Sequence, residues 1–229
     1  MIHVRGFLAI LRWDIILELR RREAVLNMSL FAVLILFLAS YGISSGRPEL
    51  QEELGPLFLW LAVLFSGTIG LSRAFSVERE GGALTGVLLT SVDPAVLYLA
   101  KVAATWLYVM AMEVFAFLAY TVLFNFSRWE RLPVLLATLG AFTYAYAAAG
   151  ITLGALTSAL RGGEVVLRIL LFPIMIPAII ISLNGSQAIF STLTAGDPAR
   201  AVKMCAALFG LGTVYLCAGI LLFEKVVEE

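Results

Sequence analysis

The stretch at residues 24–43, AVLNMSLFAVLILFLASYGI, carries no charged side chain over its whole length. The hydrocarbon core of a bilayer is about 30 Å thick, and a helix needs roughly 20 apolar residues to cross it. This stretch is therefore long enough and apolar enough to form a transmembrane helix.

The rest of the chain repeats this pattern. The six predicted spans are residues 24–43, 55–72, 97–123, 134–160, 165–183 and 201–223. The composition agrees, because only 14% of the residues are charged, whereas a water-soluble domain carries about 25%. We predict an all-α, polytopic membrane protein with six transmembrane helices, in which residues 1–229 form a single transmembrane domain.

Residues 1–23 precede the first span and are expected to form an amphipathic helix at the membrane interface. Charges at Arg12, Asp14 and Glu18 interrupt its apolar residues, so we interpret it as mature protein and not as a secretion signal.

The basic residues predict the orientation of the chain. Of the 16 lysines and arginines, five fall on one side, and the remaining eleven share the side of both termini. The five are Arg47, Arg128, Arg131, Arg200 and Lys203. By the positive-inside rule both termini are cytoplasmic.

The formal net charge of zero argues against nucleic acid as a partner.

The stretch SVEREGGALTGVLLT at residues 76–90 is then a cytoplasmic connection between spans two and three. We expect span two to continue as helix through Glu78, Arg79 and Glu80, and Gly81–Gly82 to break it, because glycine favours turns.

A short second helix follows, with Leu84, Val87 and Leu88 on one face, until Asp93 caps the next span and Pro94 enters its first turn. Such a helix is too short to be stable alone. It rests on lipid, or it docks a cytoplasmic partner; composition leaves both open.

Within the predicted spans, Glu113 is the residue that costs the most free energy to place in the membrane. It lies about 18 Å from Lys101 along span three. An ionisable side chain at this depth is a functional candidate. The alternative is a glutamate that joins helices, either protonated or bonded to a hydroxyl of span four such as that of Tyr144 or Tyr146. Lys101 is expected to reach the headgroups.

Span five contains Pro173 and Pro177, which remove two helical hydrogen bonds and predict a bend. The bend is either a static kink or a hinge along a substrate path.

Residues 184–197 are expected to form an outer loop with a short apolar centre. In span four, Gly150 and Gly154 favour close helix packing within the chain over dimerisation.

The residues predict neither a catalytic nor a metal site. The sole histidine, His3, lies outside every span, and Cys205 and Cys217 are expected to be small buried side chains. No lysine follows a glycine, so the chain lacks a phosphate-binding GxxxxGK[ST] loop. We expect it to be no enzyme and to bind no cofactor itself.

Two regions resemble a known family. EREGGALTGVLL followed by DPAVLYLAKVAATW, and LRGGEVVLRILLFPIMIPAIII at residues 160–181, are similar to CcmB, the ABC-2 type permease subunit of the bacterial cytochrome c maturation complex. In that family the second region is an arginine-glycine loop, here Arg161, Gly162 and Gly163, before a span with two prolines.

The resemblance implies a subunit of the bacterial inner membrane with a coupling helix at Leu84–Leu89, docked by a CcmA-type ATPase that holds ATP and magnesium. It also implies a second copy of the chain, a CcmC-type heme-handling protein, a small CcmD-type subunit and a CcmE-type heme chaperone, with heme as cargo of the system. A permease for another lipid-like or small-molecule substrate, or an ion-coupled secondary transporter, remains an alternative.

Overall fold

The computed structural model describes residues 2–20, 23–43, 48–81, 93–126, 129–158, 160, 162–190 and 198–228. Its helices are α1 (Ile2–Arg20), α2 (Glu23–Ile43), α3 (Pro48–Gly81), α5 (Pro94–Leu123), the 3₁₀ turn η1 (Trp129–Arg131), α6 (Leu132–Thr157), α7 (Gly163–Phe190) and α8 (Pro198–Glu228). Six of them, α2, α3, α5, α6, α7 and α8, are long and apolar enough to cross a membrane. The predicted all-α membrane fold with six spanning helices is confirmed.

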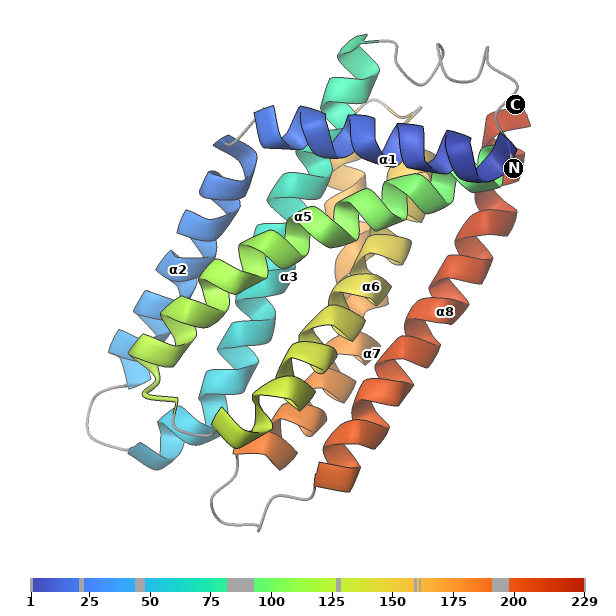
Figure 1. Cartoon of the computed structure of the whole chain (residues 1–229). Coiled ribbons are helices and arrows are strands. Elements are labelled where there is room, and N and C mark those ends of the chain that lie inside the picture. The colour runs from blue at the N-terminus through green and yellow to red at the C-terminus, as the bar shows by residue number, and fades with distance from the viewer. Residues whose placement is uncertain are drawn as a thin grey trace.

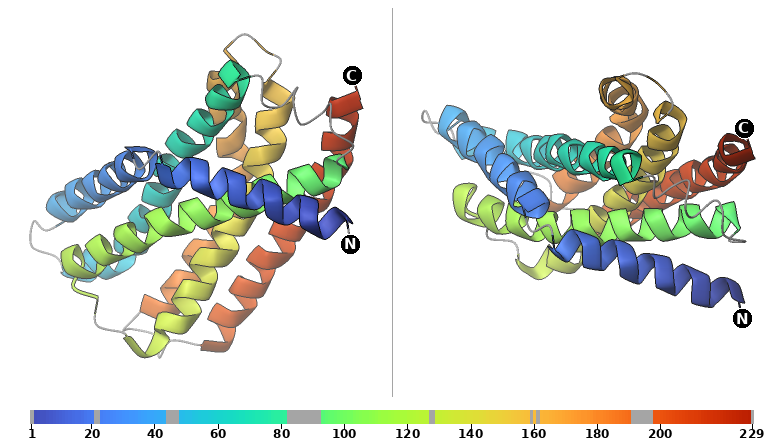
Figure 2. Two further views of the ribbon diagram at one scale, coloured as in Figure 1. Left: turned by 45° about the horizontal axis from the view of Figure 1, so that its top comes forward. Right: turned by 90° about the horizontal axis from the view of Figure 1, so that it is seen from above.

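The six long helices form a bundle, and α1 lies across one end of it (Figure 1). The beginning of α1 and the end of α8 both lie at this end, which we call the terminal end. Seen from above, α1 runs beside α5, against which it packs (Figure 2). An even number of spans accounts for the shared end, because each span reverses the side of the chain.

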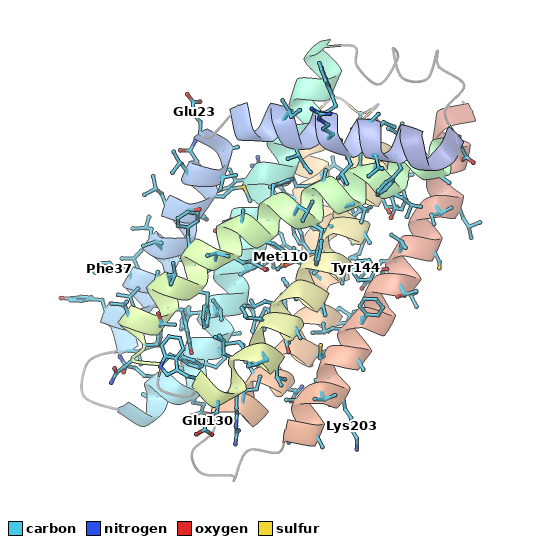
Figure 3. All side chains as sticks on the ribbon, viewed as in Figure 1. Glu23, Phe37, Met110, Glu130, Tyr144 and Lys203 are labelled. Carbon is cyan, nitrogen blue, oxygen red and sulfur yellow. The ribbon has the colours of Figure 1, made fainter. Side chains whose placement is uncertain are left out.

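Helix α6 is the centre of the bundle. It packs against α5, α7 and α8, and it is the most buried of the six spans. A small residue also lets α3 approach α6: a Cβ atom on Gly150 would lie 2.5 Å from Cδ2 of Leu71 in α3. Gly150 therefore serves packing within the chain, as expected. Large apolar side chains such as Phe37 point outward from the rim, as a lipid-facing surface requires (Figure 3).

Two helices are longer than their apolar stretches predict. Helix α3 begins at Pro48 and contains Pro56. Helix α7 continues to Phe190, so residues 184–190 are helical and not part of an outer loop. The indole Nε1 of Trp60 donates to Oγ of Ser186 at 2.9 Å, and this bond holds the polar end of α7 in the bundle.

Candidate functional site

Helix α3 continues well past its apolar span at the terminal end. Its apolar part ends at Leu71, and the helix continues through Gly81, about 15 Å further at 1.5 Å per residue. Its last turns rise beyond α1 (Figure 1). The predicted continuation through residues 78–80 is confirmed. Outside the described part of the structure lie the side chains of Glu78, Arg79 and Glu80 and all of residues 82–92, with Gly82, Leu84, Val87 and Leu88.

The start of α5 is capped as its sequence predicts. A side-chain oxygen of Asp93 accepts a hydrogen bond from the backbone N–H of Ala95 at 2.9 Å, and Pro94 is in the first turn. The cap satisfies a backbone donor that the helix itself cannot. The connection at 82–92 is thus anchored by a long helix before it and a capped helix after it.

Both described glycines of the loop between α6 and α7 have a local structural reason. Gly162 has a φ of +75°, a left-handed conformation that costs glycine little. A Cβ atom on Gly163 would overlap the backbone oxygen of Thr157. These glycines shape a tight turn between two spans, while Arg161 lies outside the described residues.

Helix α1 packs against α5, and each helix carries a charged residue near the contact. Ile10 packs against the core, and Asp14 lies one turn further along α1, half-buried. Burial raises the pKa of the Asp14 carboxyl, and the nearby ammonium of Lys101 in α5 partly offsets this increase. Lys101, expected to reach the headgroups, thus lies near enough to Asp14 of α1 to favour its ionised form.

Glu113 lies in the core, between α5 and α6. Only 3% of its surface is exposed, and the hydroxyl of Thr143 donates a short hydrogen bond to its Oε1. Its Oε2 is buried and has no hydrogen-bond partner among the residues that the structure describes. A buried carboxyl group with one free oxygen is unusual, because such oxygens are normally satisfied.

The predicted tyrosine partners of Glu113 are wrong, although the predicted helix is right. Tyr144 points toward α8, where its ring stacks on Phe209 with centroids 5.1 Å apart (Figure 3). Tyr146 points toward α3, with its hydroxyl 3.1 Å from the position of a Cβ atom on Gly67. Thr143 is the residue of α6 that faces α5. Thr143 and Tyr144 are adjacent, and adjacent residues point about 100° apart around a helix, so the two side chains face different neighbours.

The two prolines of α7 lie on its exposed side. The helix continues through Pro173 and Pro177, and both side chains are exposed. The carbonyl of Ile174, the residue after Pro173, accepts a hydrogen bond from the hydroxyl of Tyr215 in α8 at 2.7 Å. The residues whose carbonyls the prolines leave without a helical partner are Ile169 and Pro173, and both are exposed.

No group of three or more histidine, cysteine, aspartate or glutamate residues in the described ranges could hold a metal ion. The cysteines differ from expectation: Cys205 is half-buried and Cys217 is exposed, because α8 turns much of its surface outward.

Comparison with known proteins places this bundle in a family. The family model described as CcmB protein matches residues 5–219, which include every spanning helix up to the last turns of α8. The chain belongs to the CcmB family. The resemblance found in the two sequence regions thus extends over nearly the whole chain.

Curated relatives agree with this family. The heme exporter protein B of Haemophilus influenzae is 30% identical over 186 residues, which cover 80% of this chain and 81% of the relative. The protein of the same name from Bradyrhizobium diazoefficiens is 29% identical over 181 residues, covering 79% and 81%. That from Pseudomonas aeruginosa is 27% identical over 169 residues, covering 74% and 75%. The CcmB match includes Glu113, both prolines of α7 and the connection between α3 and α5.

Proposed function

We propose that this chain is the permease subunit of an ABC exporter in the bacterial inner membrane, acting in cytochrome c maturation with heme as cargo of the system. Membership of the CcmB family and the names of the curated relatives support this proposal. The chain itself is non-catalytic, and a separate CcmA-type subunit hydrolyses ATP. The other partners are a second copy of the chain and the CcmC-, CcmD- and CcmE-type proteins.

One observation carries the coupling role: α3 is a single helix from its membrane span to Gly81. A force applied at the connection 82–92 would reach the core through α3 without a flexible joint, and through the capped start of α5. The short helix expected around Leu84, Val87 and Leu88 is the element that docks the ATPase, and it lies on the cytoplasmic side together with both termini.

The experiment compares two charge reversals on the same helix. The tagged chain is purified in mild detergent from its own membranes, and co-purifying proteins are identified by mass spectrometry. Glu80→Lys, at the docking end, lowers recovery of the ATPase several-fold, while Glu53→Lys, exposed near the opposite end of α3, leaves recovery unchanged. Both variants insert normally into the membrane.

Three outcomes count against parts of the proposal. Equal recovery of the ATPase with both variants removes the docking role from the α3 end. A wild-type chain that is purified alone from several detergents argues for an ion-coupled transporter, which would move its substrate without an ATPase. An ATPase recovered without heme-handling proteins would favour an ABC-2 permease for another substrate.

A further inference from the structure

Several buried hydroxyl groups in this bundle are bonded within their own helix. A serine or threonine in a helix can donate to the carbonyl four residues earlier. Thr138, Thr152, Thr157 and Ser182 all do so, at 2.7 to 2.8 Å. Ser29 of α2 and Ser66 of α3 are equally buried, yet their Oγ atoms have no hydrogen-bond partner in the described part of the chain.

Two further buried polar atoms lack a hydrogen-bond partner among the described residues. They are Oε2 of Glu113 and the hydroxyl of Tyr146, and the side chains are 3% and 0% exposed. We call Ser29, Ser66, Glu113 and Tyr146 the polar junction. Its members come from α2, α3, α5 and α6, one from each helix.

Packing contacts bring these helices together at the junction. On α3, the phenol of Tyr146 lies against Gly67, the residue after Ser66. One turn further, Gly70 faces both Met28, the residue before Ser29, and the ring of Tyr108 in α5. On α6, Tyr146 lies one turn from Thr143, whose hydroxyl holds Glu113. The missing side chains of two glycines thus let α3 pack directly against side chains of α2, α5 and α6, the three helices that carry the other members of the polar junction.

A dry polar junction would be expensive. A buried polar atom without a partner costs about 1–3 kcal/mol, and lipid cannot supply the missing bond. Buried water solves this problem in many proteins, where each molecule makes about three hydrogen bonds to polar groups of this kind. The junction has both donors and acceptors to offer, namely hydroxyl groups and a carboxyl oxygen.

We propose that ordered water molecules occupy the polar junction and hydrogen-bond Oε2 of Glu113, the phenol of Tyr146 and the hydroxyls of Ser29 and Ser66. The water places an exchangeable hydrogen-bond network within the membrane, beside Glu113, the acidic residue of α5. Contacts through water can be remade with new partners, whereas close-packed apolar contacts cannot shift without opening a void. The inference stands on the unpartnered atoms and does not depend on the proposed ATPase coupling.

The test is X-ray hydroxyl-radical labelling of the purified full chain in lipid nanodiscs, read by mass spectrometry. Radicals form from water, so a buried residue is labelled only where water touches it. Tyr146 and Phe142 are a matched pair, one turn apart on α6 and both 0% exposed. We expect the ring of Tyr146 to be labelled and that of Phe142 to remain unlabelled.

Variants then assign the water to the junction. Glu113→Leu and the smaller change Ser66→Ala each lower labelling of Tyr146 several-fold, while Thr138→Val, which removes a hydroxyl bonded within its own helix, leaves it unchanged. No labelling of Tyr146, or labelling that survives both junction variants, overturns the proposal. Equal labelling of Tyr146 and Phe142 also overturns it, because general opening of the bundle would then admit the water.

Discussion

Gly219 occupies a position that tolerates no side chain. A Cβ atom there would overlap the hydroxyl of Tyr98 in α5 and that of Thr152 in α6, which are bonded to each other at 3.1 Å. We expect Gly219→Ala to destabilise the protein by about 1–3 kcal/mol through overpacking. Thermal unfolding in detergent, followed by circular dichroism, measures the loss.

The matched control is Gly210→Ala on the same helix. Nothing lies within 4 Å of the Cβ position at Gly210, so alanine there keeps or slightly raises the melting temperature. Equal melting temperatures for the two variants would show that α8 does not approach α5 and α6 as closely as described.

Glu113 carries the functional prediction for a single side chain. Glu113→Gln keeps the volume and an oxygen that can accept from Thr143, but it replaces the free carboxyl oxygen or its proton with an amide. We expect cytochrome c maturation to fall several-fold with normal protein abundance, as measured by heme staining and immunoblotting. The control is Glu130→Gln, because Glu130 is exposed and lies at the end of the bundle opposite the terminal end (Figure 3). A fully active Glu113→Gln protein would reduce Glu113 to a packing role.

The contact between α1 and α5 predicts a dependence of stability on pH. Burial raises the pKa of Asp14, so folding favours the protonated carboxyl, and stability falls as the pH rises from the ordinary carboxyl range through the raised pKa. Lys101 offsets part of this loss by favouring the ionised form. We expect Lys101→Met to lower the melting temperature more near neutral pH than at mildly acidic pH.

Two further variants isolate this effect. Asp14→Asn combined with Lys101→Met removes the extra pH dependence, because no carboxyl remains to be ionised there. Lys203→Met, exposed near the start of α8, shows no such dependence (Figure 3). The same pH dependence in Lys203→Met would assign the effect to total charge and not to the contact between α1 and α5.

Among the helices, apolar length predicted the spans well and their polar extensions poorly. The continuation of α3 through residues 78–80 can be predicted, because no glycine or proline lies between Leu71 and Gly81. The extension of α7 to Phe190 was not, because Asn184, Gly185 and Ser186 are typical of a loop. A bond between Trp60 and Ser186, distant in sequence, supports the helix there.

The orientation of the whole bundle is open to a direct test. In a background with Cys205→Ser and Cys217→Ser, Glu130→Cys and Arg12→Cys each place one exposed thiol, the first at the far end and the second on α1. We expect a membrane-impermeant maleimide on cells with permeabilised outer membranes to label Glu130→Cys, and to label Arg12→Cys only after the inner membrane is opened. The reverse pattern would place the termini in the periplasm.

The sequence by itself determined the class of protein, the number of spanning helices and the cap at Asp93. These are local properties, since apolar length is measured against a bilayer of nearly constant thickness and a cap involves neighbouring residues. The tertiary structure alone decided that Thr143 and not a tyrosine holds Glu113, that Lys101 comes near Asp14, and that α2, α3, α5 and α6 each carry a buried polar atom without a partner among the described residues. Each of these depends on how a helix is rotated about its axis and on where it crosses its neighbours, and that is set by the packing of the whole bundle.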